Sequence, residues 1–167
     1  LSVCVRLLDP PMHEFLPPRK SQELDRVARD VASDAGEKDV GKILARAERM
    51  REANPMLGMR GCRLGIQHPS VTAMQSRAIF EAAKACADKG IRVKPQIMVP
   101  LVATAAEFSH QANVIRDVYA EIFAGAEAVP FEIGGMVETP RAALVADRLV
   151  RAGAQFLSLG TNDLTQM

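Results

Sequence analysis

The sequence predicts an α/β protein whose strands form an incomplete (β/α)8 barrel of about five parallel strands. Short apolar segments of the length of buried strands alternate with segments of helical periodicity. No two of them are joined by a hairpin turn, so helical crossovers connect parallel strands. A complete barrel needs about 250 residues, whereas this chain has 167. An open parallel sheet is the alternative architecture.

The first expected strand, residues 2–8, ends at Asp9 because Pro10 and Pro11 can neither continue a ladder nor begin a helix. A loop to about residue 19 follows. Apolar residues at helical spacing then predict a helix over 22–35. Asp39 can cap a second helix that ends before Asn54.

A strand is also expected between residues 56 and 66, where three glycines and two arginines interrupt a short apolar segment. Periodicity does not fix its register, since 57–61 and 62–66 both qualify. Ser70 is the expected N-cap of a helix over 71–89.

The second half of the chain repeats a strand and helix alternation. A strand over 93–102 precedes Thr104 and Glu107, which have the spacing of a capping box and open a helix to about 124. A strand over 131–138 leads into Thr139 and Pro140, the expected cap and first residue of a helix that ends at 152. The last strand, 156–159, ends at Gly160.

Composition and charge exclude several kinds of partner. With 21 Lys and Arg against 20 Asp and Glu, the net charge of +1 favours neither nucleic acid nor an anionic membrane. No apolar run reaches the ~20 residues of a membrane span. Cys4, Cys62 and Cys86 form no CxxC pair, which is typical of reduced thiols in a cytoplasmic protein. The chain begins at a strand and stops just past another, so we expect it to be part of a longer protein that could also carry a targeting leader.

Two carboxylates follow neighbouring expected strands, Glu138 after 131–138 and Asp163 after 156–159. The carboxyl ends of adjacent barrel strands lie together, so these side chains could share a cation. Two hard oxygen ligands suit Mg²⁺ or Mn²⁺ better than Zn²⁺. The alternative is that Glu138 pairs with Arg141 while Asp163 merely caps a turn.

Two arginines are candidates for holding an anion. Arg6 lies in an apolar strand, where its guanidinium needs an anion or solvent, and it could grip a phosphate or carboxylate. Arg60 has glycines nearby that let the backbone approach a ligand. The alternatives are a buried Arg6 salt bridge with Asp9 and a solvated Arg60. Cys62, which follows Gly61, could have a lowered pKa or could be a packed thiol.

Four motifs resemble those of the pyruvate, phosphate dikinases, which belong to the phosphoenolpyruvate (PEP)-utilising enzymes. They are RLLDPPMHEFLP at 6–17, NPMLGMRGCRL at 54–64, VETPRA at 137–142 and GTNDLTQM at 160–167. The resemblance covers essentially the whole chain in order. The last two motifs are shared with PEP synthase and with enzyme I of the sugar phosphotransferase system, whereas the first two distinguish the dikinases.

The resemblance implies a carboxyl-terminal (β/α)8 barrel that binds pyruvate and PEP. It implies Mg²⁺ held by Glu138 and Asp163, a phosphoryl group bound by Arg6 and Arg60, and a substrate pocket lined by Gly160, Thr161 and Asn162. If Arg60 faces this site, the uncertain strand is 57–61. The phosphoryl group would be exchanged between the oxygen of the pyruvate enolate and a phosphohistidine on another domain of a dimeric parent enzyme.

The resemblance also implies what these 167 residues lack. The nucleotide-binding and phosphohistidine domains of the family have no counterpart in residues 1–167, nor does the cysteine that protonates the enolate carbon. We therefore expect the segment alone to show no dikinase turnover. The alternatives are a PEP synthase or enzyme I relative, or a non-catalytic binding or assembly module.

Overall fold

The structure is a computed structural model that describes residues 2–51, 54, 56–125 and 127–167. It contains two compact units, one formed by Leu1–Asp9 with Arg60–Met167 and the other by Pro10–Met59. The larger unit holds the sheet, and the smaller unit holds a pair of helices.

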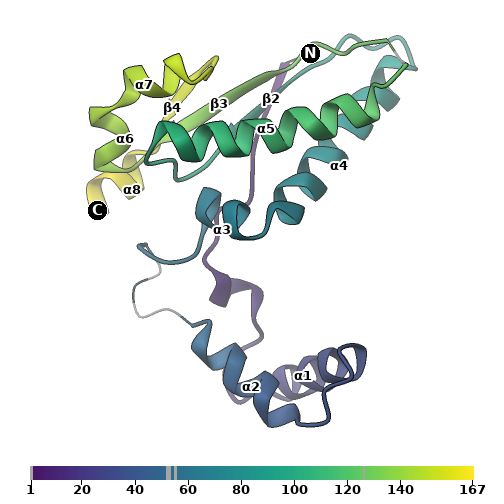
Figure 1. Ribbon diagram of the computed structural model, residues 1–167, viewed down its shortest axis with the longest axis vertical. Coiled ribbons are helices and arrows are strands. Elements are labelled where there is room, and N and C mark those ends of the chain that lie inside the picture. Colours follow the sequence, from purple (N-terminus) through teal and green to yellow (C-terminus); the bar gives the residue numbers. More distant parts are fainter. Residues whose placement is uncertain (1, 52–53, 55, 126) are drawn as a thin grey trace. The chain divides into compact units, whose positions relative to one another are not determined.

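The sheet of the larger unit has four parallel strands in the order β1-β2-β3-β4. Their bounds are Ser2–Arg6, Lys94–Val99, Glu132–Val137 and Leu157–Leu159. They curl as part of a barrel, with helix α5 (Ala105–Ile122) running along the sheet (Figure 1), which confirms the predicted partial (β/α)8 architecture. Because all four strands are parallel, the residues that follow β1, β3 and β4 lie at the same edge of the sheet.

The strand expected between residues 56 and 66 is wrong in both registers, which accounts for four strands instead of about five among the described residues. Residues 56–59 form a turn instead, and residues 61–67 form helix α3 (Gly61–Gln67). Its Cys62 amide donates to the Pro100 carbonyl over 3.1 Å. Gly65 leaves no room for a Cβ, because such an atom would collide with the side chains of Gln111 and Thr72. The Cys62 hydrogen bond and the close packing at Gly65 stabilise the helix here despite the low helix propensity of glycine.

Four helices of the larger unit cover the three segments predicted to be helical after residue 70, with shifted ends. Their bounds are α4 Pro69–Ala87, α5 Ala105–Ile122, α6 Pro140–Leu144 and α7 Ala146–Arg151. The capping box of Thr104 and Glu107 is present at the start of α5. Thr139 caps α6 as predicted, but α6 and α7 are separate helices rather than one continuous helix to 152. Ser70 is not the N-cap of α4, since that helix begins at Pro69, two residues before the expected start, and His68 is at the N-cap position.

The core of the larger unit lies between the sheet and helices α4 and α5. Phe80, Ile97, Phe108, Ile115 and Ile133 are at most 1% exposed within it. Phe80 also meets the ring of Tyr119 edge to face, with ring centroids 5.2 Å apart. The apolar faces predicted from periodicity therefore close a single core that supports the strand ends.

The smaller unit contains a 3-10 helix, η1 (Met12–Phe15), and helices α1 (Gln22–Asp34) and α2 (Val40–Arg49). The Asp39 carboxylate accepts from the Gly41 amide over 2.9 Å, which confirms its predicted role as a cap. Helix α1 ends one residue earlier than expected. Helix α2 also ends early, before the expected limit at Asn54, and residues 52, 53 and 55 near that limit lie outside the described residues.

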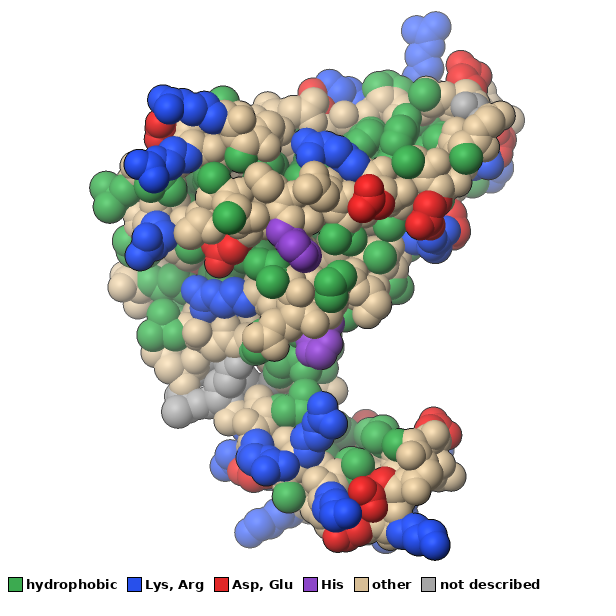
Figure 2. Space-filling view, viewed as in Figure 1, with side chains coloured by type: hydrophobic (Ala, Val, Ile, Leu, Met, Phe, Trp, Pro, Cys, Tyr) green, Lys and Arg blue, Asp and Glu red, His purple; other side chains and the backbone are tan. Residues whose placement is uncertain are grey.

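The surface carries charges of both signs. Figure 2 shows lysine and arginine side chains mixed with aspartate and glutamate over the visible face. Cys4, Cys62 and Cys86 are all free thiols. Among the described residues, no helix combines the length and apolar character needed to cross a membrane.

Candidate metal and anion site

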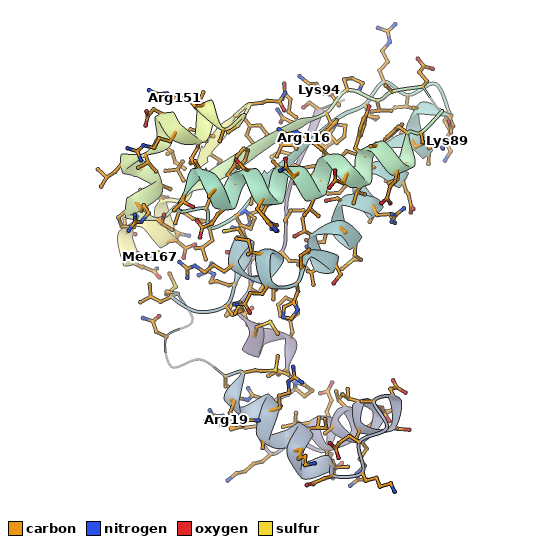
Figure 3. All side chains as sticks on the ribbon, in the orientation of Figure 1. Arg19, Lys89, Lys94, Arg116, Arg151 and Met167 are labelled. Atoms are coloured by element: carbon orange, nitrogen blue, oxygen red, sulfur yellow. The ribbon has the colours of Figure 1, made fainter. Side chains whose placement is uncertain are left out.

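Carboxylates from three strand ends meet at one edge of the sheet. Asp9 follows β1, Glu138 follows β3 and Asp163 lies just beyond β4, in helix α8 (Thr161–Gln166). Each contributes one oxygen to a group whose members lie within 4.8 Å of one another. In Figure 3, Met167, which follows α8, and Lys94, at the amino end of β2, lie on different sides of the unit. The cluster therefore belongs to the carboxyl edge, where parallel sheets gather their ligands.

Glu138 is the most deeply buried member of the cluster, with 1% of its surface exposed. The Leu101 amide donates to Glu138 Oε1 over 2.6 Å. Burial, together with the charges of Asp9 and Asp163, raises the pKa of Glu138 to about 7, although the Leu101 hydrogen bond acts in the opposite direction. A buried carboxylate beside two others calls for a compensating positive charge.

Arg60 supplies part of that charge. Its Nη2 pairs with Asp9 Oδ2, and its Nε donates to the Asp9 carbonyl over 3.2 Å. Its Nη1 and Nη2 also donate to the two carboxylate oxygens of Asp163, each over 3.3 Å. Burial opposes the charged form, but Asp9 and Asp163 outweigh it and raise the pKa of Arg60. The predicted alternative of a solvated Arg60 is therefore wrong, since the residue is 7% exposed.

The local backbone explains how Arg60 reaches the cluster. Arg60 has extended backbone angles at the N-cap of α3, and Gly61 turns the chain into the helix with a φ of 53°. A Cβ on Gly61 would lie 2.8 Å from both Asp9 Oδ1 and Leu101 Cβ. Only glycine combines this left-handed conformation with such close packing. Gly61 therefore lets the backbone pack against Asp9 and Leu101 at the start of a helix, while the predicted close approach of this backbone to a ligand stays a prediction.

Arg6 lies at the margin of the cluster. Its side chain is 47% exposed, and its Nη1 lies 3.9 Å from Asp9 Oδ2 and 3.8 Å from Met136 Sδ. The ion pair with Asp9 that the sequence left open is present, but it is not buried on the Arg6 side. Exposed N–H groups of Arg6 are accessible to an anion that approaches the carboxyl edge.

The segment after β4 brings four of the predicted residues to the same edge. A Cβ on Gly160 would lie 2.5 Å from Glu138 Cβ and Oε2, so glycine at this position allows Glu138 its place. Thr161 and Asn162 are exposed in the first turn of α8, and Asp163 is partly buried. The carboxylate of Asp163 pairs with Arg60, whereas that of Glu138 accepts from Leu101 and is not paired with Arg141 among the described contacts.

Asp9 is the residue of this cluster that sequence reasoning missed as a site residue. The sequence indicates Asp9 only as a possible ion-pair partner of Arg6. The signal was present, because Asp9 follows a predicted strand in the same way as Glu138. The rule that gathers the carboxyl ends of parallel strands applied equally to all three carboxylates.

The cluster fits a hard divalent cation such as Mg²⁺. Its donors are carboxylate oxygens, which Mg²⁺ and Mn²⁺ prefer. Asp9 Oδ1 is buried without a hydrogen-bond partner, an arrangement that is costly for a carboxylate oxygen unless a cation or water contacts it. The residues present therefore match the metal that the sequence predicted.

Cys62 takes no part in the cluster itself. Its thiol is 2% exposed and donates to the Leu101 carbonyl over 3.1 Å. Burial raises the pKa of Cys62 to about 12. The alternative of a packed thiol is correct, and the alternative of a lowered pKa is wrong.

Comparisons with known proteins place this chain in a family. The chain is 52% identical to "Pyruvate, phosphate dikinase 1, chloroplastic" of Arabidopsis thaliana and 52% identical to "Pyruvate, phosphate dikinase 2" of Zea mays. It is 51% identical to "Pyruvate, phosphate dikinase 2" of Oryza sativa subsp. japonica. Each match covers 100% of this chain but only 17 to 18% of the relative.

A family model described as "PEP-utilising enzyme, PEP-binding domain" matches residues 1–167. The match includes all four strands and each carboxylate of the cluster. The chain therefore belongs to the PEP-utilising enzymes, in which it corresponds to the PEP-binding domain.

Proposed function

We propose that this chain is the PEP- and pyruvate-binding part of a pyruvate, phosphate dikinase. The observation that carries the proposal is the carboxylate cluster of Asp9, Glu138 and Asp163 with the Arg60 guanidinium inside it. Arginine N–H groups suit the anionic phosphate and carboxylate oxygens of such a ligand, and the three carboxylates suit a cation that would bind between them and those oxygens. The identity of about half to dikinases over the full chain supports this choice of family branch.

Glu138 and Asp163 are the proposed Mg²⁺ ligands, with Asp9 close enough to add its charge. A bound Mg²⁺ would supply positive charge near the carboxylate and enol oxygens of the substrate. Arg6 and Arg60 would bind the phosphoryl oxygens through their N–H groups. Gly160, Thr161 and Asn162 would line the pocket beside the substrate.

The reaction proposed for the whole enzyme moves one phosphoryl group. The bond between phosphorus and the enol oxygen of PEP breaks as a bond from phosphorus to a histidine nitrogen forms. The enolate that is released becomes pyruvate when its methylene carbon accepts a proton. The reverse direction makes PEP. In this chain, the arginines would offset charge on the transferring oxygens, which is the main contribution a protein makes to phosphoryl transfer.

The domain organisation is part of the proposal. Residues 1–167 would form part of a PEP-binding barrel, while the phosphohistidine and nucleotide-binding domains would belong to other parts of a dimeric parent enzyme. This division agrees with a chain that spans 17 to 18% of the length of the relatives it matches. The segment alone would then lack the phosphoryl donor and show no turnover.

Calorimetric titration of the full-length protein with PEP, in the presence and absence of Mg²⁺, tests the proposal. We expect metal-dependent binding that Glu138→Gln abolishes. Glu132→Gln is the matched control, because Glu132 lies at the amino end of the same strand, where it contacts Lys94 and Gln96. Absence of metal-dependent PEP binding by the unmodified protein would contradict the proposed function.

A non-catalytic assembly role is the second candidate, and one surface favours it. An apolar hollow of about 380 Å³ lies between edge strand β1 and helix α4 and includes Val3, Val5, Ile79 and Cys86. Edge strands with apolar side chains favour association. If the 167-residue segment binds neither metal nor PEP but associates in light scattering, only this role is supported.

A further inference from the structure

We propose that Leu101 is a positioning residue whose backbone holds Glu138 and the start of α3 in place for cation binding. This inference rests on the proposed function, since it concerns Glu138 as a metal ligand. It assigns a role to the segment 100–102, which follows β2 and consists of Pro100, Leu101 and Val102. All three side chains are apolar and fully buried, so only the backbone of this segment can serve the site.

Leu101 has an unusual backbone conformation. Its φ is 57°, in the left-handed region that residues with a Cβ seldom adopt. Such a conformation persists only where the surrounding structure imposes it, and it is common at functional sites. The leucine side chain is 0% exposed, so packing and hydrogen bonds both hold it there.

The left-handed turn directs the two polar groups of Leu101 to different partners. Its N–H donates to Glu138 Oε1 over 2.6 Å, and its carbonyl accepts from the Cys62 thiol over 3.1 Å. The preceding carbonyl, of Pro100, accepts from the Cys62 amide over 3.1 Å. One residue thereby fixes both a carboxylate of the cluster and the first turn of the helix that presents Arg60.

The neighbouring contacts strengthen this arrangement. Thr139 directly follows Glu138 in the chain, and its hydroxyl donates to the Val102 carbonyl over 3.2 Å. Gly61 approaches Leu101 so closely that a Cβ would lie 2.8 Å from Leu101 Cβ. Residues behind metal ligands that fix their orientation typically affect metal affinity strongly when they are changed.

The direct test replaces the Leu101 amide by an ester in the full-length protein, by incorporating the α-hydroxy analogue of leucine. This change removes the N–H donor and keeps the side chain. We expect Mn²⁺ binding, followed by electron paramagnetic resonance, to weaken about tenfold or more. The matched control is the corresponding ester at Ala103, because the Ala103 amide donates to Glu107 Oε2 over 3.0 Å, away from the cluster. The control should keep the Mn²⁺ affinity of the unmodified protein.

A second pair of variants covers the case in which the ester protein does not fold. Cys62→Ala removes the thiol that holds the Leu101 carbonyl, whereas Cys62→Ser keeps a hydroxyl donor. We expect weaker Mn²⁺ binding in the alanine variant and at least partial recovery in the serine variant, while Cys86→Ala on α4 has no effect.

The outcomes separate the inference from the proposed function. Unmodified protein that binds Mn²⁺, with equal affinity in the Leu101 ester or in Cys62→Ala, overturns the inference alone. Unmodified protein that does not bind Mn²⁺ overturns the proposed function and the inference together. If the Ala103 ester weakens Mn²⁺ binding as much as the Leu101 ester does, the inference is also overturned, because such a result would show a general loss of structure.

Discussion

Arg60 and Asp163 form a two-bond ion pair, with each guanidinium nitrogen 3.3 Å from one carboxylate oxygen. The residues are 103 positions apart in the sequence and come from the start of α3 and the first turn of α8. Arg60 is also bound by the Asp9 carbonyl and carboxylate. Under the proposed function, Asp9 would hold Arg60 in place if Asp163 turned toward a cation, and the guanidinium N–H groups would then be directed at a ligand.

Arg60→Lys tests this role. Lysine keeps the positive charge but cannot offer the planar fork that spans Asp9 and Asp163. We expect PEP affinity, measured by calorimetry in the full-length protein with Mg²⁺, to fall roughly tenfold or more, since hydrogen bonds to charged groups contribute about 1.5–3 kcal/mol. The control is Arg77→Lys, in an exposed pair with Glu121. Unchanged PEP affinity in Arg60→Lys would show that the fork does not contact the ligand.

Gly160→Ala tests the close contact behind Glu138. The added Cβ would lie 2.5 Å from Glu138 Cβ and Oε2, so Glu138 or the β4 end must shift. We expect Mn²⁺ affinity to fall by about tenfold or more. Gly135→Ala is the matched control on β3, because its Cβ would meet neighbours only at 3.7 to 3.9 Å, an ordinary contact distance. Equal Mn²⁺ affinity in both variants would contradict the proposed position of Glu138.

Asp9→Asn tests the third carboxylate. The substitution removes a negative charge within 4.8 Å of the other two acidic groups and keeps the size of the side chain. We expect Mn²⁺ affinity to fall about tenfold, and PEP affinity to fall with it because Arg60 loses its charged partner. Asp147→Asn, in an exposed pair with Arg151, provides the comparison. A loss of PEP binding with unchanged Mn²⁺ affinity would assign Asp9 to Arg60 alone.

The edge at which the site lies could be predicted from the sequence because parallel strands impose it. The end of each apolar segment located Glu138 and Asp163, and the parallel order brought them together. The fate of residues 56–66 could not be predicted in this way. A short segment with three glycines has no decisive period, and its helix depends on contacts with Pro100 and Gln111 that are distant in sequence.

The role proposed for Leu101 has no signal in the sequence. An apolar residue at a strand end is typical of the hydrophobic core. The left-handed backbone conformation of Leu101 depends on the surrounding structure, which the sequence pattern does not show. The sequence left open whether Arg6 reaches solvent, for a similar reason. Its strand contains apolar neighbours, which suggested burial, but β1 is an edge strand and most of its residues are exposed. Contacts between elements distant in sequence therefore determine both the backbone conformation of Leu101 and the exposure of Arg6.

The raised pKa of Glu138 predicts that the free energy of unfolding and the Mn²⁺ affinity change in opposite directions as the pH rises. The pKa is about 7 in the folded protein and 4.5 ordinarily, with Asp9, Asp163 and Arg60 as the charged groups nearby. Between these values the folded state holds a proton that the unfolded state has released. The contribution of Glu138 to the free energy of unfolding therefore falls as the pH rises from about 4.5 to 7, and it is constant above that range.

The affinity for a metal ion should rise with pH over the same range, because a cation requires the ionised carboxylate. We expect Mn²⁺ affinity to rise by up to about tenfold per pH unit below pH 7 and to level off above it. Titrations of the full-length protein with Mn²⁺ between about pH 5.5 and 8, followed by electron paramagnetic resonance, measure this profile. Any Mn²⁺ affinity that Glu138→Gln retains should lack this rise with pH. A profile of the unmodified protein that is flat from pH 5.5 to 8 would contradict the raised pKa, because an ordinary glutamate is already ionised over that range.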